Sequence, residues 1–135
     1  MSPGGGRPHP RSSDGGRRGA LTIAALAWMA LIFGLSSLPG STVPVSGHLG
    51  SVGHFILYAV LGILLDLRFR ETMSPRGAVI AAVAVASLYG FSDELHQTLV
   101  PGRFPDPADW VVDTLGAAAG AVASGRDALR GTPRT

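Results

Sequence analysis

The sequence predicts an all-α membrane protein, a bundle of four transmembrane helices with both the N- and the C-terminus in the cytoplasm. Three observations predict this class. Of the 135 residues, 46% are hydrophobic and only 15% are charged, with a mean hydropathy of +0.31, so few charges are available to solvate a surface. Four apolar stretches are separated by three short connectors, of which the first and the last contain proline and glycine. The arginines gather on alternate connectors.

The first predicted helix follows a polar tail. Residues 1–19 are rich in Gly, Pro, Ser and Arg and lack apolar periodicity, which predicts a disordered cytoplasmic tail. Residues 20–38 carry no charge, and at about 1.5 Å per residue this run is long enough for the roughly 30 Å hydrocarbon layer. A cleaved signal peptide beginning at Arg17-Arg18 is disfavoured, because the run exceeds the roughly 7 to 15 residues of a signal core.

Three further transmembrane helices are predicted. Prolines and a glycine at Pro39, Gly40 and Pro44 separate the first span from the second. Ser74 and Asp106 each precede a proline, which is the pattern of a helix N-cap followed by proline at the first helical position. One four-helix domain is therefore predicted over residues 20–124, with spans at about 20–38, 49–67, 75–100 and 107–124 and a disordered cytoplasmic tail at 125–135.

The orientation follows from the arginines, because cytoplasmic loops hold the excess of Lys and Arg. All eleven basic residues are arginines, and ten of them lie in the two tails or in the connector between the second and third spans. Only Arg103 lies on the opposite side. This pattern predicts a multi-pass protein of the plasma membrane with one polar layer at its extracytoplasmic face.

The composition also excludes some functions. A net charge of +2, with the arginines in short flanks, gives no groove-sized basic patch, so no nucleic-acid partner is predicted. Because the chain has no cysteine, it has no disulfide, thiolate zinc site or cysteine nucleophile. Any catalysis would depend on carboxylates, His, Ser or Tyr. On the fourth span, Gly116 and Gly120 form a small-residue face for close packing, within one bundle or between subunits.

A polar cluster ends the third span. Asp93 and Gln97 are four residues apart and share a helix face, and Glu94 can point into the same cavity. A charged side chain near the bilayer centre costs about 2.5 to 3.5 kcal/mol on insertion scales, so intramembrane carboxylates usually face a bundle interior or a wet cavity and mark function. Glu94 and Asp93, together with His54, are the candidate catalytic residues.

The neighbouring spans add groups to the same layer. Asp109 and Asp113 lie four apart on the fourth span, and His54 and Tyr58 share a face of the second. Arg103 can pair with a carboxylate or hold an anionic group such as phosphate. The predicted ligand-binding residues are His54, Tyr58, Asp93, Glu94, Gln97, Arg103, Asp109 and Asp113.

Several of these residues have a purely structural alternative. Asp106 is expected to cap the fourth helix, Asp109 can complement the helix dipole, and Arg103 can form an interfacial ion pair with Asp93 or Glu94. Asp113 lies beyond the first turn, where capping acts, and therefore needs a buried partner or a wet pocket. Packing or interface roles are the alternative for Tyr58 and are expected for His48, and Trp28 and Trp110 are expected to be aromatic residues of the membrane interface.

No metal and no cofactor are predicted. His54 with three or four carboxylates would suit Mn²⁺, Mg²⁺ or Zn²⁺ in principle, but the spacing of these residues matches no known metal motif.

Taken in order, these residues resemble the VanZ-like family of small polytopic membrane proteins. The similarity covers most of the chain. Each short motif alone is weak evidence for the family, but the ordered series of motifs is fairly specific. The first two spans contribute Ile32-Phe33, Ser36-Ser37, Pro39-Gly40, Gly53-His54-Phe55, Tyr58 and Leu61-Gly62. The second half contributes Ser92-Asp93-Glu94-x-x-Gln97, Pro101-x-Arg103, Asp109, Leu115-Gly116 and Gly120.

Two positions depart from the family pattern. Ser51 stands where family members tend to carry a lysine, and Asp113 stands where an asparagine usually follows the aspartate of the fourth span, so the polar layer is more acidic here. The resemblance implies action at the cell envelope. Low-level teicoplanin resistance belongs to the founding member, so its transfer to this chain is an analogy.

Three functions are left open. The first is binding or modification of an envelope lipid, a lipid-linked precursor or a lipophilic glycopeptide, with Arg103 anchoring an anionic headgroup. The second is an intramembrane enzyme acting on a phospholipid or prenyl phosphate, with Glu94 or Asp93 as general base and His54 as acid or orienting partner. The third is a structural membrane protein whose polar layer fixes helix register. The sequence does not decide whether a reaction is catalysed, and it does not give the oligomeric state.

Overall fold

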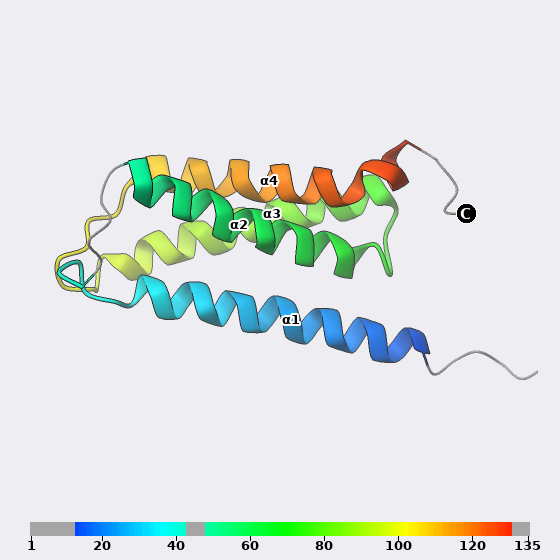
Figure 1. The fold of residues 1–135 in the computed structure, drawn as a ribbon, viewed down its shortest axis with the longest axis horizontal. Helices are drawn as coiled ribbons and strands as arrows, with labels where there is room; N and C mark the ends of the chain where they lie inside the picture. The colour runs from blue at the N-terminus through cyan, green and yellow to red at the C-terminus, as the bar shows by residue number, and fades with distance from the viewer. Residues whose placement is uncertain (1–12, 43–47, 131–135) are drawn as a thin grey trace, which may run out of the picture.

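The computed structural model describes residues 13–42 and 48–130, and over these residues the fold is all α-helical, as predicted. Pro44, the side chain of His48 and the outer parts of both tails lie outside the described residues. Figure 1 shows four long helices joined by short connectors. In chain order they are α1 (Ser13–Ser36), α2 (His48–Phe69), α3 (Pro75–Gln97) and α4 (Pro107–Leu129).

Three of the four helices are long and apolar enough to cross a membrane: Asp14–Ser36, Leu49–Phe69 and Pro75–Gln97. The helix α4 is not among them, and it carries four charged residues, namely Asp109, Asp113, Arg126 and Asp127. The fourth membrane crossing therefore stays a prediction.

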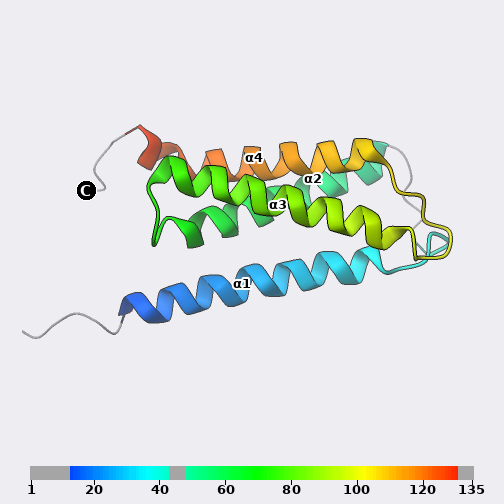
Figure 2. The same ribbon diagram turned by 180° about the vertical axis from the view of Figure 1, so that it is seen from behind.

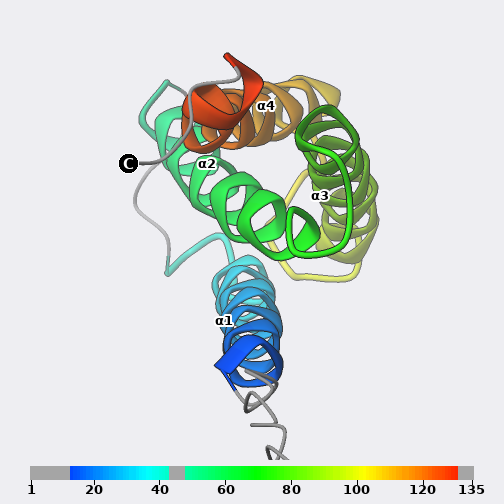
Figure 3. The same ribbon diagram turned by 90° about the vertical axis from the view of Figure 1, so that its right-hand side faces the viewer.

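The helices alternate in direction along the bundle. Helices α2, α3 and α4 pack around one another, and α1 packs against α2 and α3 on the side away from α4, as Figure 3 shows in end view. The start of α1 and the end of α4 lie at the same end of the bundle in both side views (Figures 1 and 2). The opposite end therefore gathers the end of α1, the start of α2, the end of α3 and the start of α4.

The predicted helix starts are confirmed where caps define them. Ser74 accepts a hydrogen bond from the backbone N–H of Gly77 at 3.2 Å, and Asp106 accepts one from Ala108 at 2.8 Å. At the other boundaries the helices differ from the prediction: α4 continues to Leu129, into the segment predicted as tail, while α3 ends at Gln97, three residues before the predicted end.

The first helix also begins seven residues before the predicted span, so α1 continues into the segment predicted as a tail. Tertiary contacts explain this extension. Arg17 forms an ion pair with Glu71 in the connector after α2, and Arg18 donates a hydrogen bond to the Glu71 carbonyl at 3.2 Å. Asp14 lies in the first turn, where the helix dipole favours an anion.

The side chains inside the bundle are small, and many large apolar side chains lie on the outside. Ala78, Ala82 and Ala86 of α3 are fully buried, whereas Ile80 and Leu88 of the same helix are each 70% exposed. A soluble domain rarely exposes so large an apolar surface. In a bilayer the same arrangement is favourable, because lipid covers the outer face and small residues let the helices approach closely.

Glycines bring α2 and α4 into backbone contact. A Cβ atom at Gly116 would lie 3.1 Å from Cα of Phe55, one at Gly120 would lie 3.0 Å from Cα of Ala59, and one at Gly62 would lie 2.9 Å from Cα of Ala117. The small-residue face of α4 therefore packs within this chain against α2. The sequence left open whether Gly116 and Gly120 serve packing within one bundle or between subunits, and this contact is packing within one bundle.

Gly120→Ala is predicted to lower the free energy of unfolding by about 1–3 kcal/mol, because the added Cβ would overlap the Ala59 backbone and force α2 and α4 apart. Gly34→Ala in α1 is the matched control, since a Cβ there meets nothing within 4 Å. The control should be neutral or stabilising by up to about 1 kcal/mol. Denaturant titration in detergent micelles measures both variants, and equal stabilities would contradict the close helix contact.

Candidate functional site

The polar layer lies at the end of the bundle opposite the start of α1. There Asp93, Glu94 and Gln97 near the end of α3 are all buried, and Asp113 of α4 and Tyr58 of α2 have no exposed surface. The structure thus brings together most of the residues that the sequence singled out, from three helices that are far apart in the chain.

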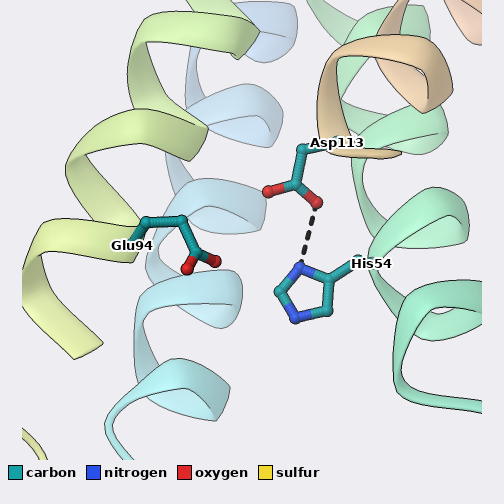
Figure 4. Close-up of side chains that lie close together, drawn as sticks. All are labelled: His54, Glu94 and Asp113. Atoms are coloured by element: carbon teal, nitrogen blue, oxygen red, sulfur yellow. Dashed lines mark hydrogen bonds and ion pairs between the residues drawn. The ribbon is translucent and has the colours of Figure 1, made fainter. Parts of the chain in front are cut away.

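His54 and Asp113 form the centre of this layer. The Nδ1 atom of His54 lies 3.0 Å from Oδ1 of Asp113, and Glu94 reaches toward the same space from α3 (Figure 4). One ligand-type atom from each of the three residues lies within 4.8 Å of the others. Gly90 makes room for this arrangement, because a Cβ at that position would lie 3.1 Å from Oδ2 of Asp113 and 3.3 Å from the Tyr58 ring.

Asp93 connects this layer to α1. Its Oδ2 atom accepts a hydrogen bond of 2.6 Å from the hydroxyl group of Ser36, the last residue of α1. Gln97 bridges the two carboxylates of α3, with its Nε2 atom 3.4 Å from Asp93 and 3.5 Å from Glu94. Sequence reasoning did not select Ser36 as a site residue, and its only signal was the Ser36-Ser37 pair at the end of an apolar span.

Glu94 also fixes the start of α4. Its Oε2 atom accepts a hydrogen bond of 2.9 Å from the backbone N–H of Asp106, while the Asp106 side chain caps α4 as predicted. Asp109 accepts a hydrogen bond of 3.1 Å from the hydroxyl group of Ser51. His96 stacks on Phe33 at a ring separation of 4.4 Å and forms a hydrogen bond of 3.0 Å with Ser37.

Arg103 does not form the ion pair with Asp93 or Glu94 that the sequence suggested. Its Nε and Nη2 atoms donate hydrogen bonds of 3.1 Å to the carbonyl oxygens of Leu38 and Leu35. A helix C-terminus leaves its last carbonyls unpaired and carries a partial negative charge, so a guanidinium group binds there favourably. The arginine thereby stabilises the end of α1.

A cavity of about 310 Å³ opens beside these residues between α1 and α2. Most of its wall is apolar, and four polar side chains line the rest of it. The polar lining residues are Ser36, His54, Tyr58 and Arg103, and the apolar ones include Ile32, Leu35, Leu38, Leu49 and Leu57. Within the described part of the chain, the hydroxyl group of Tyr58 and one oxygen each of Asp93 and Asp113 are buried without a hydrogen-bond partner.

A second polar cluster lies at the opposite end of the bundle. Asp66 is fully buried, forms an ion pair with Arg70 directly after the end of α2, and accepts a hydrogen bond from Ser124 of α4. A cavity of about 300 Å³ at this end is lined by Arg17 and Glu71, which pair with each other, and by Arg70. Because these charges neutralise one another, we assign this cluster to helix packing and place the candidate site at the other end.

The fold and the polar layer define a class: an all-helical membrane protein whose ionisable groups meet near one end of the bundle. A family model described as VanZ/LLP1 matches residues 21–125. The chain therefore belongs to the VanZ/LLP1 family, which confirms the resemblance noted from its motifs, and it is a VanZ-like membrane protein. No curated protein and no solved structure matches the chain.

Ser36→Ala is predicted to destabilise the protein by about 1–3 kcal/mol, because it removes a hydrogen-bond donor from the buried carboxylate of Asp93. The matched control is Ser92→Ala, since Ser92 is exposed and donates only to the carbonyl of Tyr89 in its own helix. That control should stay within about 0.5 kcal/mol of the wild type. Thermal unfolding followed by circular dichroism compares the two, and similar losses would contradict the proposed role of Ser36.

Proposed function

We propose that the protein is a four-span protein of the plasma membrane, with both termini in the cytoplasm, that binds the polar end of an envelope lipid or lipophilic glycopeptide. The observation that carries this proposal is the cavity between α1 and α2, which joins an apolar wall to the polar groups of His54, Tyr58 and Arg103. Small-molecule sites typically combine a largely apolar lining with a few placed polar groups.

The orientation is supported by the positions of the arginines in the bundle. The start of α1, the end of α2 and the end of α4 lie at one end and carry Arg17, Arg18, Arg68 and Arg126. The positive-inside rule assigns that end to the cytoplasm. The cavity and the polar layer would then face the outer leaflet, where lipid-linked precursors and lipophilic glycopeptides are within reach.

The binding mode follows from the cavity lining. An acyl or prenyl segment would lie against Ile32, Leu35 and Leu57, and an anionic headgroup would meet Arg103. The two hydrogen bonds from Arg103 to α1 use Nε and Nη2, which leaves the Nη1 donors for a phosphate or carboxylate. His54 would contribute a further polar contact from the cavity wall.

A second candidate function is an intramembrane acid/base enzyme acting on a phospholipid or prenyl phosphate. The specific observation in its favour is the contact between His54 Nδ1 and Asp113. A carboxylate at Nδ1 orients an imidazole and leaves Nε2 to transfer a proton, as in hydrolase triads. Glu94 would then supply the second acid or base group.

Arg103→Gln is predicted to weaken binding of a polyprenyl phosphate about tenfold or more, because a charge-assisted hydrogen bond is worth about 1.5–3 kcal/mol. Arg76→Gln is the matched control, because Arg76 lies in the first turn of α3, at the other end of the bundle. This control should leave the affinity for polyprenyl phosphate unchanged. Binding is measured by titrating labelled polyprenyl phosphate or teicoplanin into protein in nanodiscs. Absence of binding to the wild type, or equal affinities for the two variants, would contradict the binding proposal.

The enzyme alternative has its own test. Labelled phospholipid and prenyl phosphate are incubated with wild-type protein and with Glu94→Gln, and the products are separated by chromatography. The enzyme function predicts turnover by the wild type and its loss in the variant with binding retained. If the wild type turns over neither lipid, the enzyme proposal fails. If Asp93→Ala, Glu94→Ala and Arg103→Ala also keep a normal envelope phenotype at normal membrane levels, the structural role is supported instead.

A further inference from the structure

We propose that His54, Glu94 and Asp113 form a binding site for one divalent transition-metal ion, Zn²⁺ or Mn²⁺. The three residues come from α2, α3 and α4, so the residue spacing along the chain gave no metal motif, and the sequence analysis predicted no metal. The bundle nevertheless places one ligand-type atom of each within 4.8 Å of the others.

The distances suit a coordination sphere after a small adjustment. At metal–ligand bonds of about 2.1 Å, adjacent ligand atoms of an octahedral site lie about 3 Å apart and opposite ones about 4.2 Å apart. The 3.0 Å separation of His54 Nδ1 and Asp113 Oδ1 matches an adjacent pair. The largest separation in the triad, up to 4.8 Å, requires a shift of some tenths of an ångström, which rotation of the Glu94 side chain can supply.

A buried oxygen without a partner supports a ligand at this position. Asp113 has no exposed surface, and within the described residues its Oδ2 atom has no hydrogen-bond partner. Figure 4 shows the Asp113 carboxylate facing the space between His54 and Glu94. A buried polar atom without a partner is costly, so an ion bonded to Oδ2, alone or together with Oδ1, would remove a specific penalty.

The charge balance points the same way. Asp93, Glu94 and Asp113 are all buried within this layer. Among the described residues, Arg103 is the single arginine on this side, and it donates its hydrogen bonds to the backbone carbonyls of Leu35 and Leu38 instead. Buried carboxylates are normally paired with a cation or coordinate a metal. A divalent ion would neutralise two of the three charges.

The donor set determines which ion fits. Ca²⁺ and Mg²⁺ are bound almost entirely by oxygen, whereas Zn²⁺ and Mn²⁺ accept an imidazole together with carboxylates. Three protein ligands leave at least one coordination position open. Since His54 also lines the cavity between α1 and α2, an ion held here would border that cavity. The inference does not depend on the proposed lipid binding, because metal uptake can be measured without any ligand lipid.

The test uses the full chain in nanodiscs of phosphatidylcholine, purified with a tag free of histidine and stripped of metal with a chelator. Zn²⁺ and Mn²⁺ are titrated by calorimetry, and bound metal is counted by mass spectrometry. One ion per chain is expected, with affinity reduced about tenfold or more in Glu94→Gln and His54→Gln. Glu71→Gln and His96→Gln, which change the same residue types outside the triad, should bind as the wild type does.

A measurement on the wild type alone guards against variants that fail to fold. X-ray absorption of the Zn²⁺-loaded protein should show one imidazole nitrogen among oxygen ligands. The inference is overturned if the wild type takes up neither ion stoichiometrically, if the first shell contains oxygen only, or if Glu94→Gln and His54→Gln bind as tightly as the two controls. If the wild type takes up the metal ion but binds no lipid, the result contradicts the proposed function and still supports the metal site.

Discussion

The backbone contact between α2 and α4 is the constraint on which the rest of the structure depends. Gly116 and Gly120 bring α4 against Phe55 and Ala59, and Gly62 completes the contact from α2. Asp113 lies one turn before Gly116 and His54 is the neighbour of Phe55, so this contact sets how closely the two side chains approach. Both side chains are short, so an imidazole and a carboxylate can meet directly only between closely packed helices.

The first helix is held differently from the other three. Within the described residues, a Cβ added at any glycine of α1 would meet nothing within 4 Å. Hydrogen bonds join this helix to the bundle: Ser36 to Asp93, the Trp28 indole to the Leu57 carbonyl at 2.9 Å, and the Tyr89 hydroxyl to the Met29 carbonyl at 2.6 Å. The cavity lies along this looser boundary. A ligand that enters between α1 and α2 would therefore disturb few apolar contacts of the three-helix core.

Local signals in the sequence predicted the helices and the polar layer because periodicity, caps and helix breakers act over a few residues. The sequence therefore predicted that Asp106 caps α4, and that one polar layer contains His54, Glu94 and Asp113. The contact of Arg103 with the end of α1 could not be predicted in this way. Backbone carbonyls compete with carboxylates for a guanidinium group, and the pattern of side chains does not show which carbonyls are available. The buried hydrogen bond between Asp66 and Ser124 was also missed, because the two residues lie on different helices and are far apart in the chain.

The central claim is that groups from separate helices meet in one buried layer at one end of the bundle. Solid-state NMR in lipid bilayers tests it most directly, through the dipolar coupling between the ¹⁵N-labelled Nδ1 atom of His54 and the ¹³C-labelled carboxyl carbon of Asp113, assigned with His54→Gln. The 3.0 Å contact between Nδ1 and Oδ1 predicts a measurable coupling that disappears in the variant. No coupling in the wild type, with the helices intact, would contradict the account.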